Sequence, residues 1–334
     1  MKVFETTSFE DLPARSQLSP NETLTFLDYP AYFRLLNLPL PSNYEAIMEQ
    51  LEADEIVVHS DDGAWTITAL GSLLLANDLT TFRSLRRKTV RIIVYEGSNK
   101  LSTIREIEMN QGYAVGFEAL IATIDNVLPR SEEIGAALRA SVPVYPILAI
   151  RELVANALIH QDLTVTGAGP MVEIFNNRME ITNPGEPLID PIRFLDSPPR
   201  SRNEALAALM RRMGICEERG SGVDKVVFQT EFYQLPAPAF TAHSGSTQAV
   251  LFQGRPLSEM DKDNRVRACY LHACLKWVSH EFMTNTSIRE RFRIEEKNSS
   301  IASRLIKEAV EAQFVKANDA GAAKKLMRYV PFWA

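Results

Sequence analysis

Cysteine is scarce in this sequence: Cys216, Cys269 and Cys274 are the only three, and none stands in a Cys-x-x-Cys pair. An odd count without that spacing argues against a disulfide framework and a structural zinc site, and it is typical of a reducing compartment. Long apolar runs are also lacking, because the richest one, residues 71–76, is far shorter than a membrane span. Residues 1–10 lack the apolar core of a signal peptide. We therefore expect a cytoplasmic protein without a membrane partner.

A phosphate-binding run of the type Gly-x-x-x-x-Gly-Lys-Ser/Thr is absent as well. Motor helicases hold nucleotide phosphates with that loop, so helicase activity is not expected. Apolar residues, in contrast, are plentiful: 46% of the 334 residues are hydrophobic and 23% are charged. That length and composition predict two or three globular domains.

Charge is distributed unevenly along the chain. The net charge is −6, but residues 261–334 contain 14 Lys and Arg against 9 Asp and Glu, a net of +5. The rest of the chain therefore carries a net charge of −11. A basic C-terminal module on an acidic body indicates an anionic partner for that module.

Apolar patterns and turn signals divide the chain into four parts. Residues 1–29 are polar and weakly periodic, as in a linker or the remnant of a preceding domain. Residues 30–78 predict a winged-helix-like packing module, and residues 256–334 predict a second winged helix. Residues 79–255 alternate strand and helix patterns and predict an α/β (α+β) core. Within that core we expect strands at 87–95, 101–109, 171–182 and 247–252, and helices at 114–128, 146–160 and 204–213.

The helix predicted at 146–160 has the most informative pattern. Glu152, Asn156 and His160 are four residues apart, so they share one face of a helix that is otherwise almost entirely apolar. A helix this apolar is expected to be buried all round, and its polar stripe must then be paired or face a ligand. A carboxylate one turn from a carboxamide suits activation of water beside Mg²⁺. The same three residues could instead form an internal hydrogen-bond network.

Two glycine-containing segments follow this helix. Residues 183–185 (Asn-Pro-Gly) end a strand-like run, and residues 220–222 (Gly-Ser-Gly) open a helix-like run. Glycines at a loop-to-helix junction let backbone N–H groups approach a phosphate, and a helix N-terminus adds positive potential. Each segment taken alone is also an ordinary turn or loop signal. Their order and spacing after the striped helix favour a nucleotide site.

These motifs together resemble known proteins. The matching residues are Arg151-Glu152, Asn156-Ala157, His160-Gln161-Asp162, Arg178-x-Glu180-Ile181-x-Asn183-Pro184-Gly185, Ser201-Arg202-Asn203 and Glu218-Arg219-Gly220-Ser221-Gly222. Their order resembles the GHKL ATPase fold shared by the gyrase B subunit and histidine kinases. More closely, it resembles a bacterial family labelled as transcriptional regulators or "RecG-like helicase" ATP-binding proteins, in which a Schlafen/AlbA-type domain usually precedes. The resemblance runs over nearly the whole chain and implies a GHKL-like sandwich of helices on a mixed sheet, flanked by winged helices.

The resemblance implies roles for the residues that match. Glu152 would be the general base for water, and Asn156 would be the Mg²⁺ ligand. Asn183 would sit where nucleotide-binding relatives place an Asp that holds the adenine amino group. Residues 186–219 would form a lid over ATP. The other residues expected at the nucleotide are His160, Gly185, Arg202, Gly220, Ser221 and Gly222, with Arg200 and Arg219 as further lid cations.

Two residues depart from the family pattern. Asn183 has no charge, although its oxygen can still accept a hydrogen bond from an adenine amine. Pro187 stands where a second glycine would be, and it has a fixed φ and no N–H donor. Three functions therefore stay open: an ATP-binding, DNA-binding transcriptional regulator, a weak Mg²⁺-dependent ATPase, and a scaffold that has lost nucleotide binding. A homodimer is expected under each, since relatives with this fold often pair.

The second predicted winged helix contains the candidate contacts to double-stranded DNA. In such a domain the third helix, expected at 299–313, enters the major groove, and the wing touches the backbone. A helix expected at 286–292, with Asn285 or Thr286 as its N-cap, precedes it. The candidate contacts are Arg289, Arg291, Arg293, Lys297, Arg304 and Lys307, with Lys324, Lys325 and Arg328 on the wing. Docking of a protein is the alternative use of such a domain.

Overall fold

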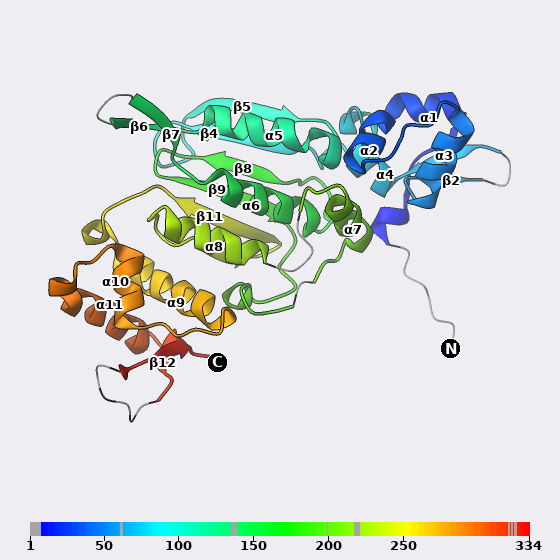
Figure 1. Cartoon of the computed structure of the whole chain (residues 1–334). Helices are drawn as coiled ribbons and strands as arrows, with labels where there is room; N and C mark the ends of the chain where they lie inside the picture. Colours follow the sequence, from blue (N-terminus) through cyan, green and yellow to red (C-terminus); the bar gives the residue numbers. More distant parts are fainter. Residues whose placement is uncertain are drawn as a thin grey trace.

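A computed structural model describes residues 8–60, 63–134, 139–198, 200–216, 221–319, 321, 323 and 326–334, with the side chains of 131–134 and 139–143 left out. Three regions follow one another along the chain: an N-terminal module, a central sheet with helices on one face, and a C-terminal domain (Figure 1). Within the described ranges, every helix is too short or too polar to cross a membrane.

The N-terminal module is built on a three-stranded antiparallel sheet in the order β1-β3-β2. Its elements are β1 (Pro13–Leu18), α1 (Pro20–Phe26), α2 (Tyr29–Leu35), α3 (Tyr44–Ala53), β2 (Val57–His59), β3 (Trp65–Thr68) and α4 (Ala69–Leu75). Several helices have a side-chain cap at their N-terminus. Ser19 and Glu22 form a capping box at α1, and Thr68 caps α4, whose residues are all buried. Because β1 pairs with β3, regular structure begins within residues 1–29, where the sequence suggested a linker.

The central sheet has six strands in the order β10-β11-β9-β8-β4-β5. Its strands are β4 (Val90–Tyr95), β5 (Thr103–Met109), β8 (Met171–Ile174), β9 (Arg178–Pro184), β10 (Ala239–His243) and β11 (Ser246–Phe252). Neighbouring strands are antiparallel except β4 and β8, which are parallel. The mixed sheet with its helices confirms the predicted α/β class and is consistent with an ATPase-like fold.

Three helices cover one face of this sheet (Figure 1): α5 (Tyr113–Val127), α6 (Ile147–Ile159) and α8 (Gly222–Phe232). Helices α6 and α8 pack against each other, and α6 also packs on β9. Their apolar side chains join one continuous core that extends into the N-terminal module. Helix α7 (Glu204–Arg212) contacts α4 and so helps to connect the two regions.

The strands and helices predicted for the core are present, with ends within three residues of those expected. The sequence pattern does not predict β10, which pairs with β11 at the edge of the central sheet as described, nor the antiparallel hairpin of β6 (Arg130–Ile134) and β7 (Arg139–Pro143). Short edge elements such as these have little hydrophobic periodicity from which they could be recognised.

Helix α6 is not buried all round, which corrects the expectation drawn from its composition. Ile147 is 37% exposed and Leu148 is 54% exposed. Ala149 and Ile150, in the same turn, are fully buried. The core therefore covers only one side of this helix at its N-terminal end.

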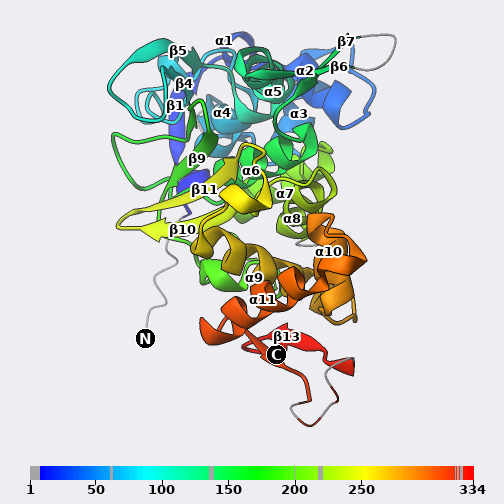
Figure 2. The same ribbon diagram turned by 90° about the vertical axis from the view of Figure 1, so that its left-hand side faces the viewer.

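The C-terminal domain consists of α9 (Lys262–Val278), α10 (Asn285–Phe292), α11 (Ser299–Glu311) and an antiparallel pair, β12 (Val315–Ala317) and β13 (Tyr329–Pro331). The N-cap of α10 is Thr284, in a capping box with Ser287, and not Asn285 or Thr286 as expected. Figure 2 shows this domain below the central sheet, with α9 between that sheet and α11. Helix α9 packs on α8, so the domain is joined to the helical layer of the sheet.

Five short 3-10 helices complete the regular structure of the described residues. They are η1 (Phe9–Asp11), η2 (Leu79–Thr81), η3 (Pro191–Arg193), η4 (Leu257–Glu259) and η5 (Glu296–Asn298). Of these, η3 lies in the connection between β9 and α7, and its neighbours take part in the cavity described next.

Candidate functional site

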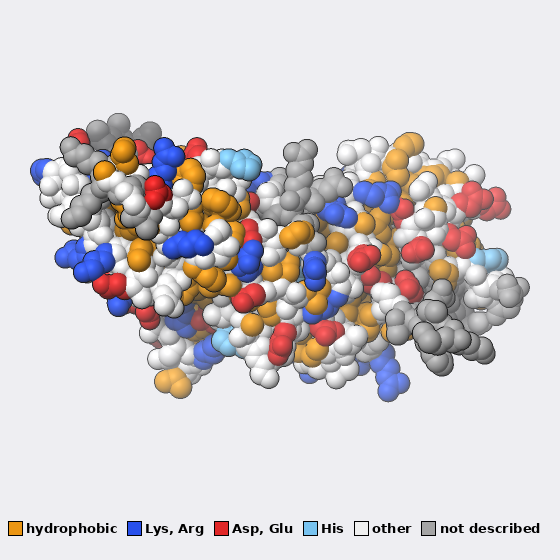
Figure 3. Space-filling view, turned by 90° about the horizontal axis from the view of Figure 1, so that it is seen from below, with side chains coloured by type: hydrophobic (Ala, Val, Ile, Leu, Met, Phe, Trp, Pro, Cys, Tyr) orange, Lys and Arg blue, Asp and Glu red, His pale blue; other side chains and the backbone are white. Residues whose placement is uncertain are grey.

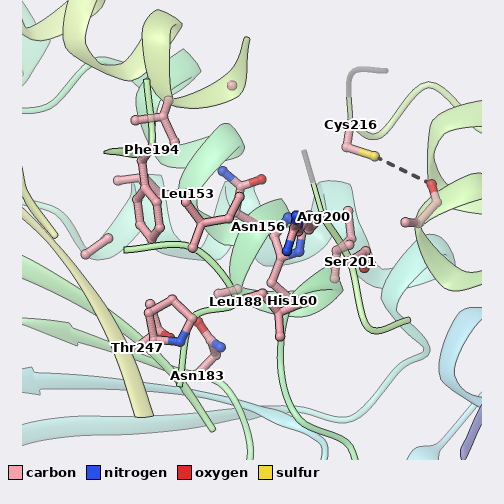
Figure 4. A pocket seen from close by; sticks show the side chains of 18 of the residues that line it. Leu153, Asn156, His160, Asn183, Leu188, Phe194, Arg200, Ser201, Cys216 and Thr247 are labelled. Atoms are coloured by element: carbon pink, nitrogen blue, oxygen red, sulfur yellow. Dashed lines mark hydrogen bonds between the residues drawn. The ribbon is translucent and has the colours of Figure 1, made fainter. Parts of the chain in front are cut away.

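A cavity of about 640 Å³ is lined by residues of α6, β9, β11, the start of α8 and the segment that connects β9 to α7. Figure 4 shows Phe194, Asn183 and Thr247 on one side of the view and Arg200 on the other, with Asn156 between them. One side of the cavity is therefore aromatic with hydrogen-bonding groups beside it, and the other side is cationic.

The polar stripe of α6 faces this cavity. Glu152, Asn156 and His160 all line it, as their spacing predicts. The carboxylate of Glu152 also lies near a cation of α8, because Nζ of Lys225 is 3.9 Å from its Oε1. The apolar residues of α6, such as Val154 and Leu158, are buried in the core. The helix thus presents its polar groups to the cavity, while Val154 and Leu158 pack into the core.

Helix α8 begins directly beside the stripe. A Cβ added at Gly222 would stand 2.8 Å from Oε2 of Glu152 and 3.6 Å from Nδ2 of Asn156. With any other residue at position 222, the Glu152 carboxylate or the start of α8 would have to shift. Ser221 immediately precedes the helix, whereas Gly220 and Arg219 lie outside the described residues. The N-terminus of α8 adds positive potential at this point of the cavity.

The end of β9 places Asn183 in the cavity wall. Asn183 is 6% exposed, and its Nδ2 donates to the Pro184 carbonyl oxygen at 3.2 Å, which leaves Oδ1 as the acceptor. Gly185 has a φ of +97°, and a Cβ there would stand 2.6 Å from Cβ of Asp162. Gly185 therefore permits the turn rather than touching the cavity itself. Thr247 pairs with Asn183 between β11 and β9 and lines the cavity beside it.

Arg202 connects the segment between β9 and α7 to the end of α6 through hydrogen bonds. Its Nη1 donates to the His160 carbonyl oxygen at 3.1 Å, and its Nη2 donates to that of Glu186 at 2.8 Å. The next residue, Asn203, is 3% exposed and donates to the carbonyl oxygens of residues 159 and 161, both at 2.8 Å. These bonds hold the second half of the segment against α6. Arg200 and Arg202 both line the cavity that the segment encloses.

His160 is uncharged near neutral pH. Burial, and secondarily the guanidinium of Arg202, lower the pKa of His160 to about 4. A neutral imidazole has one donor and one acceptor. His160 can therefore hydrogen-bond to a ligand in the cavity but does not attract it by charge.

The predicted site residues do not include Leu188, Phe194, Phe240 and Thr247, which also line the cavity. Phe194 and Phe240 pack edge to face with ring centroids 5.6 Å apart. Phe194 belongs to the connecting segment and Phe240 to the unpredicted strand β10. Alternation along β11 could have indicated a face for Thr247, but not the strand that lies opposite.

The candidate DNA contacts divide into buried and exposed residues. Arg291 is 4% exposed and donates from Nη2 to the Leu235 carbonyl oxygen at 2.6 Å, so it cannot reach DNA, and this corrects the expectation. Arg289 is half-buried, and Lys324 and Lys325 lie outside the described residues. The exposed candidates are Arg293, Lys297, Arg304, Lys307 and Arg328.

Some of the exposed cations have acidic neighbours. Lys297 pairs with Glu295 at 2.6 Å, and Lys307 lies 3.5 Å from Glu311. Figure 3 nevertheless shows many Lys and Arg side chains on the left of the view, where the C-terminal domain lies, and more Asp and Glu toward the right. The charge asymmetry of the sequence is thus visible on this face of the molecule.

Residues 167–251 match the family model described as "Putative ATP-dependent DNA helicase recG C-terminal". The matched stretch includes β8, β9, the connecting segment, α7, α8, β10 and β11. It supports an ATPase-like domain of this type in the central part of the chain. Helix α6, with Glu152 and Asn156, lies just before the matched stretch. Among curated proteins, none matches this chain.

Among solved structures, the chain is similar to the DIP2311 protein from Corynebacterium diphtheriae, with 17% sequence identity and a TM-score of 0.57. The similarity covers 96% of this chain and 64% of that protein. This chain therefore spans less than two thirds of that protein's length. At this identity the likeness shows a shared fold, which extends beyond the ATPase-like part to nearly the whole chain.

Proposed function

We propose that this protein binds ATP with Mg²⁺ in the cavity between α6 and α8, and that the bound nucleotide regulates DNA binding by the C-terminal domain. The observation that carries the proposal is the close approach of Gly222, at the start of α8, to the Glu152 carboxylate beside Asn156. The match of residues 167–251 to an ATPase-like domain supports it.

The cavity suits a nucleotide in size and in chemistry. Its volume of about 640 Å³ lies within the range of roughly 300–1,000 Å³ that is typical of small-molecule sites. Apolar side chains suited to a purine base are Leu153, Ile181, Leu188, Phe194, Phe240 and Ala249. Cations suited to phosphate groups are Arg200, Arg202 and Arg211.

Mg²⁺ would be held mainly by the nucleotide. Among the described residues, no group of three His, Cys, Asp or Glu side chains stands close enough to form a metal cage. Mg²⁺ typically takes one or two protein ligands and completes its shell with phosphate oxygens and water. Asn156 would supply the protein ligand, and the ion would neutralise charge on the phosphates. The donor set of the cavity therefore fits a nucleotide-bound ion.

The other residues of the stripe and the turn have separate tasks in this proposal. Glu152 would accept a proton from water, and Nζ of Lys225 lies 3.9 Å from its Oε1. Asn183 would accept a hydrogen bond from the exocyclic amine of adenine through Oδ1. Arg202 would shape the lid, since its guanidinium is bonded to two backbone carbonyls. Slow hydrolysis of ATP is compatible with this arrangement.

The C-terminal domain supports the second half of the proposal. Its three helices and the β12–β13 pair have the order of a winged helix, in which α11 would enter the major groove. Arg304 and Lys307 are exposed on that helix, and Arg293 and Lys297 are exposed just before it. A homodimer, which would present two such helices to two half-sites, is part of the proposal.

A scaffold without nucleotide is the second candidate function. The observation that favours it is the cavity wall itself, in which Asn183 has no charge and Pro187 has no N–H donor. Under this hypothesis the DNA affinity of the C-terminal domain would not respond to ATP or ADP. The two candidates therefore differ in one measurable property.

Calorimetric titration with ATP, ADP and a non-hydrolysable ATP analogue, each with and without Mg²⁺, tests the proposal. We expect saturable, Mg²⁺-dependent binding that weakens by about 10-fold or more in Asn156→Ala, because a metal ligand is lost. Asn177→Ala, at an exposed turn between β8 and β9, is the matched control and should bind like the parent. Absence of binding with every nucleotide would reject the proposal in favour of the scaffold.

Phosphate release and DNA binding separate the remaining alternatives. Glu152→Gln should keep nucleotide binding and lose any turnover, because the amide cannot accept the proton. Fluorescence anisotropy with labelled duplex DNA, with and without nucleotide, tests the regulatory part. Equal DNA affinity in the presence of ATP, ADP and no nucleotide would contradict regulation even if ATP binds.

A further inference from the structure

We infer that the C-terminal domain completes the nucleotide site: it holds Phe194 in the cavity wall, where this ring stacks on the purine base, and it thereby links nucleotide binding to its own packing. The inference rests on the proposed function. It adds a base-contacting residue and a physical connection between the two parts of the chain.

Residues 190–196 have two faces. Phe194 lines the cavity and packs edge to face on Phe240. Its neighbours face the other way: Leu195 is 6% exposed and belongs to the core of the C-terminal domain, and Ile192 packs against the same core. The segment begins with η3, whose N-cap is Asp190, so its backbone is locally ordered. Any movement of the C-terminal core at this point would therefore move Phe194.

Two aromatic residues of the C-terminal domain fasten this segment. The Tyr270 hydroxyl of α9 donates a hydrogen bond to the Ile192 carbonyl oxygen. Trp333 donates from Nε1 to the same hydroxyl oxygen at 3.0 Å. The guanidinium of Arg193 lies 4.3 Å from the centroid of the Trp333 ring, in a cation–π contact. Neither Tyr270 nor Trp333 lines the cavity, so their effect on a ligand would pass through Phe194.

Helix α8 provides a second connection between the same two parts. Val223, in its first turn, lines the cavity and packs against the core of the C-terminal domain. At the other end of the helix, Glu231 is 2.9 Å from Nδ1 of His272 and 3.4 Å from Nε of Arg291. Both partners are buried residues of the C-terminal domain. The domain is thus attached at both ends of the helix that begins at the cavity.

A flat heteroaromatic ring is the ligand group that suits this wall. Phe194 and Phe240 offer an aromatic surface, and Asn183 and Thr247 offer hydrogen-bonding groups on the same side of the cavity. Stacking on an aromatic side chain accepts any base, while the polar groups select among them. A ligand that needs Phe194 in place will favour the docked C-terminal domain, and by linkage the docked domain will favour the ligand.

The test uses two mild substitutions in the full chain. Tyr270→Phe removes the hydrogen bond to Ile192, and Trp333→Phe removes the indole donor. Trp277→Phe is the matched control, because Trp277 is in the same domain and packs on Phe282. We measure the affinity for the non-hydrolysable ATP analogue by calorimetry. Separately, without nucleotide, we measure amide hydrogen exchange of residues 190–197, several of whose N–H groups are hydrogen-bonded within the segment.

The expected result is about 5- to 10-fold weaker binding and faster exchange of residues 190–197 in Tyr270→Phe and Trp333→Phe, with neither change in Trp277→Phe. Unchanged exchange in both variants would overturn the inference. Faster exchange with unchanged affinity would overturn the stacking role of Phe194. If the parent binds no nucleotide, the proposed function fails, and exchange alone then decides whether the C-terminal domain holds the cavity wall.

Discussion

Gly222 and Glu152 stand closer together than a side chain at position 222 would allow without a shift of the Glu152 carboxylate or of α8. A Cβ at Gly222 would stand 2.8 Å from Oε2 of Glu152, which is closer than real Cβ atoms approach another group. The missing side chain therefore sets how near the first turn of α8 comes to the middle of α6. In the proposed function this is the place where phosphate groups, Mg²⁺ and the attacking water would gather.

Gly222→Ala is expected to weaken nucleotide binding by about 10-fold or more, because the added methyl group must displace the Glu152 carboxylate or the start of α8. The free energy of unfolding should change little, because the greater helix propensity of alanine, about 0.5–1 kcal/mol, offsets the cost of that displacement. The control is Gly254→Ala, whose added Cβ would meet only Leu235 Cδ2 at 3.4 Å. Calorimetry that gave equal affinities for the two variants would contradict the proposed position of the phosphates.

His160→Gln should make stability less dependent on pH. The pKa of His160 is about 4 in the folded protein, against 6.5 as its ordinary value. As pH falls from about 6.5 to 4, the unfolded chain takes up a proton that the folded protein refuses, so stability is lost on acidification. The parent should therefore lose about 2 kcal/mol more than the variant between pH 7.5 and pH 5. Urea unfolding at the two pH values measures this, and parallel losses in both proteins would show that His160 is not buried as described.

Asp224→Asn is expected to stabilise the protein at alkaline pH. Burial raises the pKa of Asp224 to about 6, and its Oδ1 has no hydrogen-bond partner among the described residues. Between about pH 4 and pH 6 the folded protein keeps a proton that the unfolded chain releases, so stability falls as pH rises through this window. Because Asp224 is only partly buried, we expect a gain of about 1–2 kcal/mol at pH 8 and little at pH 4. A gain of the same size at both pH values would point to packing and not to titration.

Replacement by alanine should reduce stability at Arg291 but DNA binding at Arg304. Arg291 is buried beside Glu231, so Arg291→Ala leaves that carboxylate short of a partner and should cost about 3–5 kcal/mol of unfolding free energy. Arg304 is exposed on α11, so Arg304→Ala should change stability by less than about 0.5 kcal/mol while it weakens DNA binding. Urea unfolding and anisotropy at two salt concentrations check both halves. If Arg304→Ala left DNA affinity and its salt dependence unchanged, α11 would not be the contact helix.

Much of the fold could be predicted because local chemistry determines it. The four-residue spacing of Glu152, Asn156 and His160 predicts a stripe on one helix face, and all three line the cavity. Turn and cap residues mark element ends in the same local way, although the cap of α10 fell on Thr284, one residue before the nearer candidate. These features depend on residues within one or two turns of each other, which is the range that a sequence pattern reports.

The remaining features depend on which surfaces meet. Thr247 lies opposite Asn183 because β11 pairs with β9. Phe194 lines the cavity because its neighbours Leu195 and Ile192 pack into the core of the C-terminal domain, which is formed by residues far away in the sequence. Periodicity states which residues share a face, but it does not name the face opposite.

The sequence by itself thus determined the α/β class, the striped helix and the glycine at the start of α8. Only the tertiary structure decided that Arg291 is buried beside Glu231 while Arg304 is exposed. It also decided that the start of α6 is open to solvent and that Tyr270 of the C-terminal domain bonds to the Ile192 carbonyl, two residues from Phe194 in the cavity wall. The physical reason is that burial is a property of contacts between segments far apart in the chain, and two arginines of the same domain differ only in the partners that folding brings to them.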